Sequence, residues 1–231
     1  MERWYPDELE LAGPEHLDRT FVEGYDRKQR FDPSADVTLM TDLGIGRDAT
    51  VVDLGAGTGT FALAAAPHVG RVVAVDISPV MVDVLRSRVR NSGFDNLTVV
   101  EGGLLSYSHI GDAPQLVYCR NVLHHLPDFW KGVALQRIAA VLAPNGALVV
   151  RDIVFDFDPA AAPARIGEWL AGAADDADDG YTAEDFIEHL RTEHSTYRAV
   201  FDDLLQGAGF RVLDVSIRRS VYAEYTCAIG R

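Results

Sequence analysis

The sequence predicts an α/β protein built on a doubly wound, largely parallel sheet. Short apolar runs rich in Val, Leu or Ile alternate with longer segments of helical periodicity. The runs are residues 50–54, 71–75, 97–100, 116–119 and 147–153. Continuous apolar runs of this length are typical of parallel strands that are covered on both faces. Their alternation with helices indicates βαβ units with right-handed crossovers.

The first two thirds of the chain divide into a helical cap and a core. Residues 1–45 are expected to form the N-terminal cap, in which residues 14–43 predict two helices broken near Pro33. Residues 46–154 are expected to form the core. Within it, Ser78 has the character of a helix N-cap, and Pro127 is placed to open the helix that follows the fourth strand.

The last third of the chain departs from this alternation. Residues 155–209 predict a helical insertion, expected to act as a lid, before the strands resume. The runs 210–218 and 221–228 are separated by only two residues, so they should pair as an antiparallel hairpin within the C-terminal segment 210–231. All of these parts are assigned to one domain, residues 1–231.

Charge and composition exclude several classes of protein. The 231 residues include 21 Lys and Arg against 35 Asp and Glu, a formal net charge of -14. Such a chain repels a polyanion, which favours a small-molecule substrate and no nucleic acid partner. No apolar run approaches the roughly 18 residues that span a bilayer, so we expect a cytoplasmic protein with no membrane partner. Cys119 and Cys227 form neither a disulfide framework nor a CxxC motif.

A glycine-rich turn follows the first predicted strand. Its spacing is D-x-G-x-G-x-G, from Asp53 through Gly55 and Gly57 to Gly59. Glycines at such a strand-to-helix turn let the backbone turn tightly and approach a ligand closely. The dinucleotide fingerprint G-x-G-x-x-G needs a glycine at position 60, which is Thr60 here, so an NAD-dependent dehydrogenase is disfavoured.

The second predicted strand ends at Asp76, 21 residues after Gly55. A carboxylate at this position can accept hydrogen bonds from both hydroxyls of a ribose. The alternative is that Asp76 only favours the start of the following helix through the helix dipole. The preceding glycine turn favours the ribose role.

With these motifs, the chain resembles the class I S-adenosylmethionine-dependent methyltransferases, in their small-molecule branch with an LHHL loop. The matching segments, in family order, are DLGAGTG at 53–59, VDISPVM at 75–81, RNVLHHLPD at 120–128 and LAPNGALVVRD at 142–152. The resemblance implies a Rossmann-like seven-stranded sheet in the order 3-2-1-4-5-7-6, with the last strand antiparallel and helices on both faces. It also implies S-adenosylmethionine as cofactor and S-adenosylhomocysteine as product.

The resemblance also implies a set of cofactor-binding residues. The glycine turn would lie along the methionine part and the ribose, Asp53 near the amino group, and Ile77 against adenine. Many relatives carry an acid for the adenine amino group where this chain has Gly103, so backbone groups near Leu104 are expected to take that role. The full set is Tyr25, Asp53, Gly55, Ala56, Gly57, Asp76, Ile77, Met81, Gly103, Leu104 and Arg120.

The loop after the fourth predicted strand supplies the candidate catalytic residues, His124 and His125. It should lie at the carboxyl edge of the sheet, where ligands bind in such folds. Imidazole is well suited to take a proton from a nucleophile near neutral pH. The alternative is that one histidine packs under the cofactor and the other caps the next helix.

The predicted function is methyl transfer from S-adenosylmethionine to O, N or C of a small organic acceptor. The alternative is a cofactor-binding sensor or partner subunit without transferase activity; the oligomeric state stays open. His189 and Glu193 are four residues apart and share a helix face, so they could ligate a metal. Two ligands without a third partner predict polar pairs or a lid surface instead, and no metal site is predicted.

Overall fold

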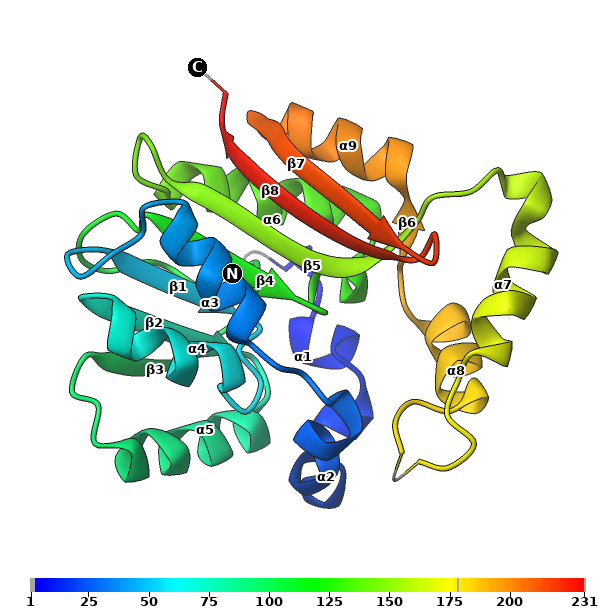
Figure 1. Ribbon diagram of the computed structural model, residues 1–231, viewed down its shortest axis with the longest axis horizontal. Coiled ribbons are helices and arrows are strands. Elements are labelled where there is room, and N and C mark those ends of the chain that lie inside the picture. The colour runs from blue at the N-terminus through cyan, green and yellow to red at the C-terminus, as the bar shows by residue number, and fades with distance from the viewer. Residues whose placement is uncertain (1–2, 178, 231) are drawn as a thin grey trace.

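The computed structural model describes residues 3–177 and 179–230, folded around one central sheet (Figure 1). The order of its strands is β3-β2-β1-β4-β5-β8-β7, and the short β6 pairs with β5 off this path. The strands are β1 (Thr50–Leu54), β2 (Arg71–Asp76), β3 (Leu97–Glu101), β4 (Leu116–Arg120), β5 (Ala147–Phe155), β6 (Thr196–Tyr197), β7 (Phe210–Arg218) and β8 (Tyr222–Ile229).

The sheet order confirms the prediction. Strands β1 to β5 are parallel, whereas β8 runs antiparallel to both β5 and β7. Leaving out β6, which the sequence did not predict, the order is the expected 3-2-1-4-5-7-6. Two residues of β6 pair with Val154 and Phe155 at the end of β5.

The helices lie on both faces of the sheet and at one of its edges (Figure 1). The α-helices are α1 (Glu8–Leu11), α2 (Arg19–Gln29), α3 (Ser34–Asp42), α4 (Thr60–Ala65), α5 (Pro79–Ser92), α6 (Asp128–Val141), α7 (Ala162–Ala171), α8 (Ala183–Thr192) and α9 (Arg198–Gly207). Short 3-10 turns are η1 (Pro14–Leu17), η2 (Ala66–His68), η3 (Leu123–His125) and η4 (Pro159–Ala161).

Alternating side chains of the parallel strands enter two separate apolar cores. Val51 and Val72 pack with Met40 of α3, Phe61 of α4 and Leu85 of α5 on one face. On the other face, the core combines alternate residues of the same strands with residues of α6 and α9: Val52, Val73, Val117, Leu135, Leu148, Phe201 and Leu205. Burial on both faces explains why the strands read as continuous apolar runs.

The N-terminal cap and the insertion are more divided than the sequence indicated. The cap contains α1, η1, α2 and α3, where two helices were expected; the break near Pro33 lies between α2 and α3. The insertion holds α7, α8 and α9 together with β6. In Figure 1, α1, α2 and α8 gather at the side of the sheet toward which β4 points. Of the described helices, none is long and apolar enough to cross a membrane.

The β7–β8 hairpin turns through two residues in the left-handed region. Arg219 and Ser220 have φ of 54° and 57°, and the Val221 N–H donates to the Arg218 carbonyl over 3.1 Å. This is the geometry of a turn that favours Asn-Gly. An L-residue with a Cβ is strained there by roughly 1–2 kcal/mol.

We therefore expect Ser220→Gly to raise the free energy of unfolding by about 1 kcal/mol, because glycine adopts positive φ without that strain. Urea denaturation measures the change. The control is Ser216→Gly in the exposed middle of β7, where glycine should instead destabilise. A Ser220→Gly protein no more stable than the wild type would contradict the turn assignment.

Candidate cofactor and acceptor site

The glycine turn joins the end of β1 to α4 and keeps the space beside it open. Gly55 has φ of 75°, and a Cβ there would lie 2.5 Å from Cγ2 of Val122. Gly59 has φ of 89° and would collide with the Leu85 side chain if it carried one. Any larger residue at these two positions would therefore strain the backbone and crowd its neighbours.

Asp76 ends β2 beside this turn, as predicted. One oxygen of its buried carboxylate accepts from the Gly57 N–H and the other from the Ser78 N–H, both over 2.8 Å. Burial raises the pKa of Asp76, although the two backbone donors oppose the shift. Each oxygen still has a free lone pair, so the carboxylate can accept two further hydrogen bonds.

Two adjoining cavities surround the turn, with volumes of about 620 and 490 Å³. They share Tyr25, Gly55, Gly57 and Asn121 as lining residues. The larger is also lined by predicted cofactor residues: Asp76, Ile77, Met81, Gly103 and Leu104. The smaller is lined by the rest of the predicted set: Asp53, Ala56 and Arg120. The structure thus brings all the predicted cofactor-binding residues around one continuous hollow.

The smaller cavity contains a carboxylate without a partner. Asp53 is 2% exposed, and its Oδ2 makes no hydrogen bond. Burial, followed by the charge of Asp76, raises the pKa of Asp53 to about 8. Arg120 lines the same cavity and lies over the Phe31 ring at 3.9 Å. A ligand with both a positive and a negative group fits this acid and this guanidinium, because a neighbouring positive charge favours the ionised form of the Asp53 carboxyl.

Glu8 of α1 enters the larger cavity beside Gly103. The buried Glu8 accepts from the Leu105 N–H over 2.8 Å through Oε1, while its Oε2 has no partner. A Cβ on Gly103 would collide with the Glu8 carboxylate, so the glycine makes room for it. The carboxylate of Glu8, from the N-terminal cap, thus occupies the space that a side chain at position 103 would fill, beside the backbone of Leu104 that was expected to take this role.

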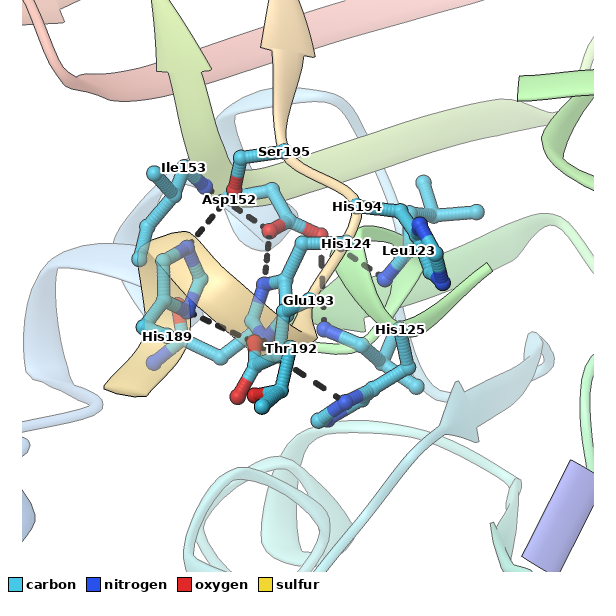
Figure 2. A network of polar contacts seen from close by, with 12 residues as sticks. Leu123, His124, His125, Asp152, Ile153, His189, Thr192, Glu193, His194 and Ser195 are labelled. Atoms are coloured by element: carbon cyan, nitrogen blue, oxygen red, sulfur yellow. Dashed lines mark hydrogen bonds and ion pairs between the residues drawn. The ribbon is translucent and has the colours of Figure 1, made fainter. Parts of the chain in front are cut away.

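The two candidate catalytic histidines lie differently in η3. His125 lines the larger cavity, whereas His124 is not among the described residues that line it. Nδ1 of His124 lies 2.5 Å from Oδ1 of Asp152 on β5, and Nε2 lies 2.9 Å from Oε2 of Glu193 (Figure 2). Both ring nitrogens of His124 are therefore taken up by carboxylates.

Glu193 is the centre of this buried cluster. Its Oε2 lies 2.6 Å from Nδ1 of His189 and 3.9 Å from Nδ1 of His125. His189 is fixed in turn through its Nε2, 2.8 Å from the Ser195 hydroxyl. Nδ1 of His125 is buried and makes no hydrogen bond. Figure 2 shows the three histidines converging on Glu193 from η3 and α8.

The cluster shifts the pKa values of the neighbouring imidazoles of His124 and His125 in opposite directions. Burial alone would lower the pKa of His124, but Asp152 and Glu193 outweigh burial and raise it to about 10. Burial, then the charge on His124, holds the pKa of His125 well below its ordinary value. Burial would raise the pKa of Glu193, yet His124 and His189 keep it well below the ordinary range.

Sequence reasoning missed several residues of the site. Glu8 and His16, which both line the larger cavity, lie in the cap, where no motif marked them. Asp152 ends the matching segment 142–152 but was not predicted as a site residue. Its place late in β5 is a signal for function. Glu193 was considered with His189 alone; its contact with His124 joins residues 69 positions apart (193 minus 124).

Polar contacts hold the insertion against the end of α2, where Gln29 lines the smaller cavity. Lys28 pairs with Asp185 at 2.7 Å and lies 5.0 Å from the Tyr181 ring centroid. The Gln29 amide donates to the Tyr181 hydroxyl over 2.6 Å. Arg30 pairs with Asp179, with both side chains more than half exposed. The N-terminal cap and the insertion are therefore joined through these three pairs of side chains.

The sheet order, the glycine turn and the acid at the end of β2 are the features that the resemblance to class I S-adenosylmethionine-dependent methyltransferases implied. Residues 51–146 match the family described as methyltransferase domain, so the chain carries this domain and the predicted class is confirmed.

Among curated proteins, the chain is similar to the uncharacterized methyltransferase YcgJ of Bacillus subtilis. The two are 31% identical over 139 residues, which cover 60% of this chain and 54% of YcgJ. The chain thus spans about half the length of this relative.

Solved structures share the fold at low sequence identity. A methyltransferase from Clostridium acetobutylicum gives a TM-score of 0.70 at 14% identity, covering 92% of this chain and 98% of that one. Magnesium protoporphyrin IX methyltransferase from Synechocystis, solved with bound S-adenosylmethionine, gives 0.67 at 15% identity, covering 99% and 100%.

We expect Lys28→Met to loosen the insertion, because it removes a partly buried ion pair and a cation–π contact worth about 1 kcal/mol together. A protease that cleaves at Asp should then cut the α7–α8 loop, which contains Asp175 and Asp176, about five-fold faster. Arg30→Met is the control and should change the rate little, because its pair is exposed. Equal rates for Lys28→Met and the wild type would count against this contact.

Proposed function

We propose that the chain transfers a methyl group from S-adenosylmethionine to O, N or C of a small organic acceptor. The proposal rests on one arrangement: a continuous hollow around the glycine turn with partnerless carboxylate oxygens at both ends, on Asp53 and Glu8. A buried, unpaired polar atom is costly unless a ligand satisfies it.

The residues present fit the cofactor from end to end. Asp53 and Arg120 would hold its amino and carboxylate groups, since they bring opposite charges to the smaller cavity. Asp76 would accept from the ribose hydroxyls, and Ile77 with Leu104 would cover the adenine. Glu8 would accept from the adenine amino group through Oε2.

Little covalent chemistry is asked of the protein. The cofactor supplies an activated methyl group on a sulfonium, and the reaction is an in-line displacement that depends on alignment and on exclusion of water. Tyr25 lines both cavities. Burial raises the pKa of its hydroxyl, which therefore stays neutral where the two cavities adjoin. The contacts between α2 and the insertion would exclude water.

The acceptor would approach from the side of His125. This residue lines the larger cavity with His16 of η1, and their ring centroids lie 5.5 Å apart. Burial lowers the pKa values of both residues, so two neutral imidazoles face the hollow. This surface would orient an organic acceptor. His124 would act from behind it, because its nitrogens face Asp152 and Glu193 and it does not line the larger cavity.

The first test is a thermal shift with S-adenosylhomocysteine and NADH side by side. A ligand that binds only the native state raises the melting temperature, and we expect this for the adenosyl ligand alone. Asp76→Ala should weaken its binding on the order of 100-fold, from about 3 kcal/mol of lost hydrogen bonds. Stabilisation by NADH alone would overturn the proposal. Cofactor binding without methyl transfer to any acceptor of a broad panel would favour a sensor or partner subunit.

The role of Glu8 predicts a change of base preference. Glu8→Gln should bind S-adenosylhomocysteine about 10-fold more weakly, because an acceptor for the amino group is lost. The same variant should gain affinity for S-inosylhomocysteine, since the new amide can donate to its 6-oxo group. Calorimetry measures both, and Glu10→Gln, on the exposed side of α1, is the matched control. An unchanged ratio of the two affinities would refute the assignment.

A further inference from the structure

The histidine cluster next to the larger cavity contains buried nitrogen and oxygen atoms that could bind a metal ion and that lack a hydrogen-bond partner. The side chains of His124, His125 and Glu193 each offer one nitrogen or oxygen, and these atoms lie within 4.8 Å of one another. Nδ1 of His125 and Oε2 of Glu193 are both buried without a hydrogen-bond partner. Oε2 lies at ion-pair distances of 2.9 Å from Nε2 of His124 and 2.6 Å from Nδ1 of His189, so the imidazoles already crowd around this one oxygen.

We propose that His124, His125 and Glu193 form a binding site for one divalent transition-metal cation, of the kind that imidazole and carboxylate ligands select from Fe²⁺ to Zn²⁺. The ligand atoms are Nε2 of His124, Nδ1 of His125 and a carboxylate oxygen of Glu193. Two His and one carboxylate leave coordination positions open.

The spacing of the ligand atoms fits such an ion. Metal bonds of about 2.1 Å at tetrahedral angles hold two ligand atoms about 3.4 Å apart. Oε2 of Glu193 lies 2.9 Å from Nε2 of His124 and 3.9 Å from Nδ1 of His125. Shifts of about half an ångström would bring both pairs to that separation.

The surroundings orient two of the ligands, as they do in metal sites. Asp152 lies 2.5 Å from Nδ1 of His124 and also accepts from the Leu123 N–H over 2.8 Å. Because Asp152 contacts Nδ1 of His124, Nε2 of the same ring faces Glu193. His189, fixed by Ser195, holds Glu193 from the other side. Asp152 and His189 are therefore positioning residues.

The backbone fixes the insertion against η3 at this point. The His194 N–H donates to the His124 carbonyl over 2.8 Å, and the Lys131 ammonium donates to the His194 carbonyl. Glu193 lies immediately before this contact, at the C-cap of α8. The ligands from the core and from the insertion are thus already brought together, so a cation would bind to a preformed site.

The place of the site suggests what the ion does. His125 belongs to both the ligand set and the lining of the larger cavity, so a metal held there would lie beside that cavity. An acceptor that offers one or two oxygen atoms to the metal would be held beside the cofactor. This role rests on the proposed function, whereas metal binding itself does not.

The test uses the full chain, stripped with a chelator and titrated with Co²⁺ alone, whose visible absorption reports the ligand set. We expect the wild type to bind a single equivalent that Zn²⁺ displaces. Glu193→Gln and His125→Ala should each bind Co²⁺ at least about 100-fold more weakly, and Asp152→Asn about 10- to 100-fold more weakly. His194→Ala is the matched control, because its exposed side chain lies outside the ligand set.

Binding of S-adenosylhomocysteine is measured on the Glu193→Gln and Asp152→Asn variants, as a check of folding that does not involve the metal; His125 lines the cofactor cavity, so the folding of His125→Ala is checked by its melting temperature. Retained binding of this ligand with lost Co²⁺ binding supports the site. A wild type that binds no equivalent of Co²⁺, or variants that bind it as the wild type does, would overturn the proposal. Stoichiometric Co²⁺ without adenosyl binding would support the metal site and count against the proposed function instead.

Discussion

The rest of the site depends on the backbone turn that follows β1. The N–H groups of Gly55 and Ala56 both donate to the Val75 carbonyl over 2.9 Å, and the Gly57 N–H donates to Asp76. The turn is therefore tied to the end of β2, and the acid that ends β2 is oriented by the turn. Because Gly55 lacks a side chain, Val122 from the β4 loop can pack against it. These hydrogen bonds and this packing contact thus position the glycine turn, Asp76 and Val122 around the cavities.

Negative charge accumulates in that hollow at an energetic cost. Asp53 and Asp76 are both buried, and the charge of Asp76 raises the cost of ionising Asp53. Proteins retain such arrangements chiefly at functional sites. A ligand with an ammonium group, hydroxyl donors and an aromatic amino group would satisfy Asp53, Asp76 and Glu8 in turn. Two carboxylates also come together at the histidine cluster, where Asp152 and Glu193 both face His124 and need a positive charge between them.

The parts of the structure that could be predicted are those that local sequence determines. Asp76 follows an apolar strand directly, and the glycine turn and the hairpin each occupy a few consecutive residues. Glu8 could not be predicted, because its role depends on space that Gly103 leaves almost one hundred residues later. Glu193 could be placed on a helix with His189, but no spacing rule connects α8 with η3. For the same reason β6 was missed: two residues become a strand only because the end of β5 offers them a partner.

This division between local and long-range determinants largely follows the part of the chain that matches the family model. The turn, Asp76 and the β4 loop lie within residues 51–146, the part of the chain that matches the methyltransferase domain. Glu8, His16, Asp152 and Glu193 all lie outside it. Of the two imidazoles proposed to orient an acceptor, His125 lies within the matched part and His16 in the cap, and their rings meet only in the folded chain. The sequence similarity therefore covers only one half of that surface.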